Sequence, residues 1–471
     1  MTSTLPHSSP SAQGVDARGI LSFLDALAAA PQVEMHSMML LRHGTVVAEG
    51  WWAPYAADRP HLLYSLSKSF TSTALGFAVA EGLVSLDDTV LSHFPEFDAD
   101  ITDPRSRRIL VRHVAAMASG HRIDTIEAAR ALDPDDLVRG FLLIPPDDEP
   151  GSVFAYNQPC TFSIAAIIQK AAGMPLTQYL RPRLFEPLGI GEVGWLTDQR
   201  GRELGWSGLH APADAIAKLG QLYLQRGEWN GRQLLDPAWV DDATRAHIAN
   251  PAEPNPDWAQ GYGFQFWMAR HGYRGDGAYG QFCVVLPEQD AVLAITGQSL
   301  DMQAVLDAAW KHLLPAMDDS AAHPEPRGDA SAAERELEDR LASSALPPAP
   351  GSAIVGEVRT FAPGPQNAVR SITRVTVTPA SGRTLVTLTE VNADFSFEVG
   401  VGEWIAGDAV VASGGALETG EHVFEVIFVE TPHRLRIVCG GVDVPESAFS
   451  AHWVTEPLHA LPLAEMRMPR G

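Results

Sequence analysis

The sequence has few cysteines and no long run of apolar residues. Cys160, Cys283 and Cys439 lie far apart without the spacing of metal-binding motifs, so neither a disulfide framework nor a cysteine metal site is expected. No apolar stretch reaches the roughly 18 residues that a membrane span needs. The opening stretch MTSTLPHSSPSAQGVDARG has neither the cationic nor the apolar region of a signal peptide, and we therefore expect a cytoplasmic protein.

Positive charge is also scarce. The chain carries 34 Lys and Arg against 58 Asp and Glu, a formal net charge of −24. This charge argues against nucleic acid or an anionic membrane as the main partner, because phosphate binding needs clustered cations. Hydrophobic residues at 45% and charged residues at 20% are ordinary for a folded globular protein.

Composition divides the chain into four parts. Residues 1–18 are polar, which predicts a flexible arm. Residues 19–317 have strand patterns at both ends and helical patterns between them, which predicts one α+β domain with its helices segregated from its sheet. Residues 318–350 are rich in Ala, Pro and acidic residues, as in a linker. Residues 351–471 alternate apolar and polar positions between turns, which predicts a small all-β barrel or sandwich domain.

Apolar periodicity and bounding glycines predict the individual elements. The predicted helices span 19–30, 65–81, 111–119, 161–172, 214–226, 302–314 and, inside the linker, 331–343; the predicted strands span 38–41, 46–52, 281–286 and 291–296.

The first chemistry-bearing pair is Ser65 and Lys68, in an apolar helix with little other charge. Residues three apart share a helix face, so the hydroxyl and the amine can meet. A serine becomes a useful nucleophile when a neighbour takes its proton, and a desolvated lysine with a lowered pKa can do so. The chain has only four lysines, yet a Ser-x-x-Lys match alone is weak, because a solvated helix lysine gives the same pattern.

Two further segments carry candidate site residues. In Pro150–Gln158 a Pro-Gly turn precedes Tyr156, whose phenol beside an ammonium could be held partly as phenolate and relay protons, and Gln158 could bind a substrate amide. In Gly275–Gln281 three glycines stand beside a predicted strand, where something can approach the backbone closely. Taken singly, a packed tyrosine and a plain glycine turn are the better explanations of these segments.

Together the three segments resemble the serine β-lactamase-like, penicillin-recognising hydrolases. That family includes class C β-lactamases, DD-peptidases, esterases and nylon-oligomer hydrolases, with Ser-x-x-Lys, Tyr-x-Asn and Lys-Thr-Gly or His-x-Gly motifs in this order. The resemblance covers roughly residues 20–316. It implies an antiparallel five-stranded sheet flanked by helices, an all-helical lobe, and a site between them. The stretches that add to it are EGLVSLDD, RHVAAMASGH, PLTQYLRPRLFEPLGI and YGFQFW.

The resemblance also implies roles. Ser65 would be the acylated nucleophile, Lys68 its activating partner and Tyr156 the shared acid/base. The backbone N–H groups of Ser65 and Ala278 would form the oxyanion hole, where losing one donor typically costs about 3–4 kcal/mol. The substrate-binding residues would be Gln158, Asp276, Gly277 and Tyr279, and no metal or organic cofactor is implied.

The chain departs from the family at the second and third motifs. Gln158 stands where Asn is usual, and Gly275-Asp276-Gly277 lacks the cation that holds a substrate carboxylate in relatives. This loss argues against strong β-lactamase or DD-peptidase activity. Arg274 or Arg270 could replace the cation; the alternative is that both are solvated.

The remaining candidates are weaker. His121 and His271 could lie near the site or be ordinary packed or surface residues. Trp206 and Trp267 could wall an apolar pocket, and Trp404 and Phe424 are expected in the core of the β domain.

We therefore expect a serine hydrolase that cleaves a small ester or amide through an acyl-enzyme, with homo-oligomerisation left open. One alternative is a D-amino-acid-directed peptidase or weak β-lactamase. Another, from a different class, is a penicillin-fold binding or scaffold protein without turnover.

Overall fold

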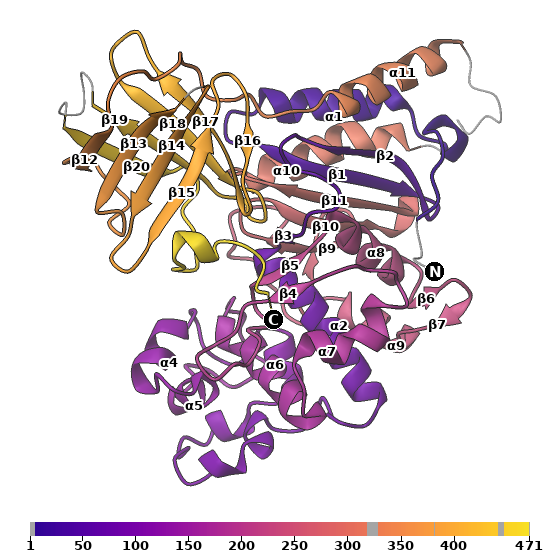
Figure 1. Ribbon diagram of the computed structural model, residues 1–471. Helices are drawn as coiled ribbons and strands as arrows, with labels where there is room; N and C mark the ends of the chain where they lie inside the picture. The colour runs from indigo at the N-terminus through magenta and orange to yellow at the C-terminus, as the bar shows by residue number, and fades with distance from the viewer. Residues whose placement is uncertain (1–4, 318–327, 381, 441–446, 471) are drawn as a thin grey trace. The chain divides into compact units, whose positions relative to one another are not determined.

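The computed structural model describes residues 5–317, 328–380, 382–440 and 447–470 (Figure 1). Residues 1–4 of the predicted arm, 318–327 of the predicted linker, and 381, 441–446 and 471 of the predicted β domain lie outside the described residues. The chain forms two compact units, one of Met1–Gly50, Leu63–Ala342 and Arg470–Gly471 and one of Trp51–Leu62 and Ser343–Pro469. None of the described helices is both long and apolar enough to cross a membrane.

The first unit is built on one sheet, in the order β2-β1-β11-β10-β9-β8. Strands β1, β10 and β11 are buried along their whole length, because helices cover both faces of the sheet. Figure 1 shows α1, α10 and α11 on one side of this sheet and α8 on the other. The strands are β1 (Met35–Arg42), β2 (Thr45–Trp51), β8 (Trp267–Met268), β9 (Tyr273–Gly277), β10 (Gln281–Leu286) and β11 (Ala291–Gly297).

The α+β class is confirmed, with one difference in the sheet. The family resemblance implies five strands, whereas the two-residue β8 adds a sixth at the edge, beside β9. The helices against the sheet are α1 (Ala17–Ala29), α8 (Ala213–Leu224), α10 (Met302–Ala308) and α11 (Gly328–Ala342). The helices of the helical lobe are α2 (Ser67–Ala80), α3 (Val111–Ala115), α4 (Ile126–Leu132), α5 (Leu137–Leu143), α6 (Gln158–Ala172), α7 (Leu176–Leu180) and α9 (Pro237–Ala243). Two short strand pairs accompany them: β4 (Gly194–Trp195) pairs with β5 (Leu209–Ala211), and β6 (Glu228–Trp229) pairs with β7 (Arg232–Gln233).

Helix α2 is buried on nearly all sides, from Ser67 to Ala78. Its polar side chains are satisfied by backbone carbonyls of the surrounding loops: Ser69 donates to Gln265, Thr71 to Gly205 and Ser72 to Phe264. These bonds tie the helix that follows Ser65 to the loop that carries Trp206 and to the segment directly before β8, which begins at Trp267.

The second unit is a nearly closed β barrel, as expected for the C-terminal region. Its nine strands run in the order β15-β14-β13-β12-β20-β19-β18-β17-β16, and a bridge joins Gly400, directly after β15, to Ser413 in β17. Phe424 is in the buried core, and the indole of Trp404 donates to the carbonyl of Leu346. The strands are β12 (Arg359–Pro363), β13 (Arg374–Ala380), β14 (Arg383–Thr389), β15 (Asp394–Val399), β16 (Ile405–Ala406), β17 (Val410–Ala416), β18 (His422–Phe428), β19 (Arg434–Cys439) and β20 (Ala448–Trp453).

The grouping of the chain differs from the predicted boundaries in two segments. Residues 51–62 belong to the second unit, because Trp52 and Tyr55 pack with Leu346, Val411 and Ile427. Helix α11, inside the predicted linker, belongs to the first unit, where it contacts α1.

Candidate active site

Ser65 and Lys68 meet at the start of α2. Ser65 lies in the 3-10 turn Tyr64–Leu66, directly before the helix. The Nζ atom of Lys68 lies 3.0 Å from the Oγ atom of Ser65. Tyr64 has a φ of +49°, a strained value for a residue with a side chain, and this turn sets the direction of Ser65. The contact that the i, i+3 spacing allows is thus formed.

The amine of Lys68 has three acceptors, which match its three hydrogens. Besides Ser65, it donates to Oε1 of Gln158 at 2.7 Å and to the carbonyl oxygen of Trp206 at 2.8 Å. Lys68 is only 1% exposed, and this burial lowers its pKa to about 7 against the opposing charges of Asp124 and Asp276. A large share of the protein therefore carries a neutral amine beside Ser65 at neutral pH.

Tyr156 stands over this pair. Its ring stacks on Trp267 with centroids 5.3 Å apart and meets Tyr262 edge to face, and Nζ of Lys68 lies 4.6 Å from its centroid. Burial and the charge of Asp276 raise the pKa of Tyr156, against the lowering effect of a hydrogen bond with the Ser65 side chain. The phenol therefore stays protonated, which differs from the expectation of a partial phenolate, because burial and the charge of Asp276 disfavour its charged form.

Strand β9 reaches the segment of Ser65 through two glycines. A Cβ atom on Gly277 would lie 2.1 Å from the carbonyl oxygen of Leu63, and one on Gly275 would lie 2.4 Å from Oγ of Ser69. Only glycine allows so close an approach of the strand to the segment that carries Ser65.

The turn after β9 presents Ala278 to the same cavity as Ser65. Neither the N–H of Ser65 nor that of Ala278 donates a hydrogen bond to another of the described residues. Both donors are therefore available for an oxygen atom in the cavity.

The cavity around Ser65 has a volume of about 510 Å³. Of the predicted site residues, Ser65, Tyr156, Asp276, Gly277 and Ala278 line it. Lys68 and the predicted substrate-binding residues Gln158 and Tyr279 are not among its lining residues. The other lining residues are Glu253, Asn255, Trp258, Trp267, Leu300, Asp301, Met302 and Gln303.

Arg274 is not solvated. It is fully buried, its Nε donates to Oδ2 of Asp276 at 3.0 Å, and its guanidinium lies 4.3 Å from the ring centroid of Trp258. Arg270 is also engaged, with Asp257 and Asp307. Neither arginine lines the cavity, so neither replaces the missing cation: Arg274 is bound to the lining carboxylate of Asp276, and Arg270 is bound to Asp257 and Asp307 outside the lining.

Two of the weaker candidates lie elsewhere. His121 is buried and bonded to Ser119 and to the carbonyl of Ile144, and the ring of His271 lies against Trp310. Trp206 contributes its carbonyl rather than a wall of the cavity, whereas Trp267 does line it.

Asp124 is a contributor that sequence reasoning missed. Its carboxylate accepts from the backbone N–H of Gln158 and is the largest charge that keeps the pKa of Lys68 from falling further. No motif marks this residue, and its role comes from the fold of the loop before α4. Within the described residues, no group of three or more His, Cys, Asp or Glu side chains is placed to hold a metal ion.

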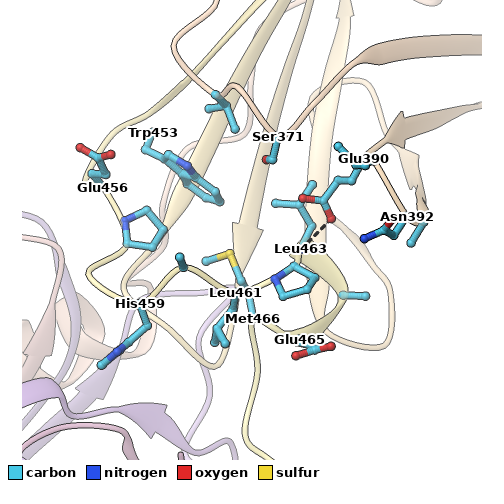
Figure 2. A pocket seen from close by; sticks show the side chains of 17 residues that line it. Ser371, Glu390, Asn392, Trp453, Glu456, His459, Leu461, Leu463, Glu465 and Met466 are labelled. Atoms are coloured by element: carbon cyan, nitrogen blue, oxygen red, sulfur yellow. Dashed lines mark hydrogen bonds between the residues drawn. The ribbon is translucent and has the colours of Figure 1, made fainter. Parts of the chain in front are cut away.

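The second unit has a cavity of its own, of about 710 Å³ (Figure 2). Trp453, Leu461 and Met466 give it apolar walls, and Glu390 accepts a hydrogen bond from the backbone N–H of Leu463 at 3.0 Å. The sequence has no lysine after Lys311, so this cavity cannot hold a serine–lysine pair.

The fold and the serine–lysine pair define a serine hydrolase of the penicillin-recognising class. Residues 22–316 match the family model described as Beta-lactamase, and the chain belongs to this family. Over 299 residues the chain is 24% identical to the 6-aminohexanoate-dimer hydrolase of Paenarthrobacter ureafaciens, covering 57% of this chain and 76% of that protein. Over 215 residues it is 24% identical to esterase EstB of Burkholderia gladioli, covering 40% and 55%.

A solved structure has the same fold. EstCE1, a hydrolase with promiscuous acyltransferase activity, superposes with a TM-score of 0.53 at 19% identity, covering 64% of this chain and 100% of that one. The predicted family and the assignment as a serine hydrolase enzyme are confirmed.

Proposed function

We propose that this protein hydrolyses a small ester or amide through an acyl-enzyme on Ser65. The observation that carries the proposal is the 3.0 Å contact between Oγ of Ser65 and the buried amine of Lys68, whose pKa is lowered to about 7. Two relatives support the substrate class by their names, a hydrolase of an amide dimer and an esterase.

Each proton in the proposed reaction has a place. Neutral Lys68 takes the proton of Ser65 as Oγ attacks the carbonyl carbon, and the N–H groups of Ser65 and Ala278 hold the resulting oxyanion. Tyr156, a protonated phenol, donates its proton to the leaving oxygen or nitrogen, and the Lys68 ammonium restores that proton. Water then attacks the acyl carbon of the acyl-enzyme. Its hydroxyl bonds to that carbon and its proton goes to neutral Lys68, which returns a proton to Oγ of Ser65 as the bond between Oγ and the acyl carbon breaks.

The remaining predicted residues have positioning roles in this proposal. Gln158 orients the amine of Lys68, because its Oε1 already accepts from Nζ at 2.7 Å. Gly277 lets β9 bring the Ala278 N–H close to Ser65. Asp276 directly precedes Gly277, and Tyr279 directly follows Ala278.

Ser65→Ala tests the proposal. We expect the variant to lose hydrolysis of p-nitrophenyl esters and labelling by a fluorophosphonate, whereas the unaltered protein is labelled at Ser65, as mapped by mass spectrometry. Ser69→Ala is the matched control, because Ser69 is buried and donates to Gln265 rather than lining the cavity. Ester hydrolysis retained by Ser65→Ala would refute the mechanism; absence of any adduct on the unaltered protein would support a binding or scaffold protein.

The β-lactamase and peptidase alternatives are less well supported. Their substrates carry a carboxylate, and among the residues that the structure describes the lining of the cavity contains Glu253, Asp276 and Asp301 but no Lys, Arg or His. We expect slow turnover of nitrocefin beside that of neutral esters, and comparable rates would contradict this argument.

A further inference from the structure

The charged groups of the catalytic cavity are all of one sign. Within the described part of the chain, its lining includes the carboxylates of Glu253, Asp276 and Asp301 and no cationic side chain. Asp276 is compensated by Arg274, which lies behind it and is fully buried. Glu253 and Asp301 are therefore the groups that set the charge of the cavity.

The hydrogen-bond partners of Glu253 and Asp301 are neutral. Oε1 of Glu253 accepts from the Nδ2 and the backbone N–H of Asn255, and Oδ1 of Asp301 accepts from the backbone N–H of Ala304. Among the described residues, neither carboxylate forms a salt bridge. The nearby Arg270 is taken up by Asp257 and Asp307. Asp301 also caps α10, whose N-terminal dipole offsets part of its charge, so Glu253 carries the larger share.

We propose that the substrate of this site carries a positive charge, an alkylammonium group that Glu253 and Asp301 attract into the cavity beside Ser65. The inference rests on the proposed hydrolysis and adds its substrate class. An ammonium gains Coulomb energy from the two carboxylates, while a substrate carboxylate is repelled by them. Trp258 and Trp267 also line the cavity, although Arg274 lies over the ring of Trp258 and Tyr156 stacks on that of Trp267, and both add apolar surface for the carbon atoms of such a substrate.

Three matched p-nitrophenyl esters test this charge preference: those of γ-trimethylammoniobutyrate, of its tert-butyl isostere and of glutarate. Each kcat/KM is divided by the rate of uncatalysed alkaline hydrolysis, which removes intrinsic reactivity. We expect the cationic ester to be preferred roughly ten-fold over the neutral one and the anionic ester to be the poorest, with a preference that weakens as salt is added. A second series compares an ester of choline with the same ester of its tert-butyl analogue. It tests whether the site prefers a cation in the leaving alcohol.

The variants separate charge from shape. Glu253→Gln and Asp301→Asn keep size and hydrogen bonding, and we expect each to lower the cation-to-neutral ratio by about three-fold and the double variant to bring it near one. Glu228→Gln is the control of equal charge change, because Glu228 is exposed on β6 and does not line the cavity. A ratio near one in both series for the unaltered protein, or a ratio that the double variant leaves unchanged, would overturn the proposal.

Binding to Ser65→Ala, measured by calorimetry, gives a second readout that needs no turnover. The probes are the amides of γ-trimethylammoniobutyrate and of its tert-butyl isostere. Tighter binding of the cation supports the charge preference, and equal binding overturns it. Failure of the hydrolytic proposal would show separately, as no turnover of any ester that depends on Ser65.

Discussion

The rings of Tyr64 and Tyr279 meet edge to face, with centroids 5.7 Å apart. Tyr64 directly precedes Ser65 and Tyr279 directly follows Ala278, so the contact joins the two segments that carry the proposed oxyanion donors. Both tyrosines have positive φ angles, +49° and +67°, which residues with side chains adopt only when the surrounding structure holds them. The ring contact therefore helps to hold two strained turns in place.

Tyr279→Phe and Tyr279→Ala should have different effects. Phe keeps the ring contact with Tyr64, and we expect kcat/KM within about three-fold of the unaltered protein. Ala keeps the strain of the positive φ and loses the contact, so the Ala278 N–H is less well held and kcat/KM should fall roughly 10- to 100-fold. Steady-state kinetics on a neutral ester measure both. An equal loss in the two variants would assign the effect to the hydroxyl instead of the ring.

The activity should follow the titration of Lys68. Its pKa is lowered to about 7 and the neutral amine is the base, so kcat/KM should rise with pH, level off above about 7 and fall ten-fold per pH unit well below it. The raised pKa of Tyr156 keeps the phenol protonated, so no alkaline decline should begin below pH 10. Lys68→Arg, which stays charged, should be inactive throughout. If the acidic limb of kcat/KM instead had its midpoint near pH 4, the base would be a carboxylate.

The buried pair of Arg274 and Asp276 should show strong coupling in stability. Arg274→Met leaves the Asp276 carboxylate buried without its hydrogen-bonded arginine and should cost about 3–5 kcal/mol of unfolding free energy. Adding Asp276→Asn should recover part of that loss, with a coupling of about 1–3 kcal/mol in a double-mutant cycle from chemical denaturation.

The control for this pair is Arg226→Gln, which breaks an exposed pair with Asp241 and should change stability little. Equal losses at the two arginines, or additive losses at Arg274 and Asp276, would contradict a coupled buried pair.

Gly277→Ala should damage catalysis through the backbone. Its Cβ would stand 2.1 Å from the carbonyl oxygen of Leu63 and 3.1 Å from the backbone nitrogen of Leu66, so β9 must move away from the nucleophile. We expect kcat to fall about 100-fold or more as the Ala278 N–H leaves its place. Gly191→Ala, with no atom within 4 Å of the added Cβ, should keep full activity. Equal activity in the two variants would remove the Ala278 N–H from the mechanism.

Much of the architecture could be predicted from local patterns. The apolar runs of β10 and β11 and the helical spacing of α1 and α8 lie in the structure within a few residues of their predicted bounds. Helix α3 is shorter than predicted and ends at Ala115, because the chain turns into the left-handed region at Met117, which apolar periodicity does not report.

The contacts of Lys68 also divide into one that local spacing predicts and others that it does not. The contact between Ser65 and Lys68 follows from i, i+3 spacing on one helical turn, a geometry that the sequence itself determines. The carbonyl of Trp206 and the charge of Asp124 at Lys68 have no such signal, since 138 residues separate Lys68 from Trp206.

The elements, the order of the motifs and the adjacency of Ser65 and Lys68 could be predicted along the chain, because they depend on dihedral angles and on periodicity within a single segment. The burial of Arg274 against Asp276, the protonated state of Tyr156 and the shared cavity of Glu253, Asp301 and Ser65 follow only from the packing of distant segments. Burial and charge at these positions are sums over neighbours from distant parts of the chain, and only the packed molecule brings those neighbours together.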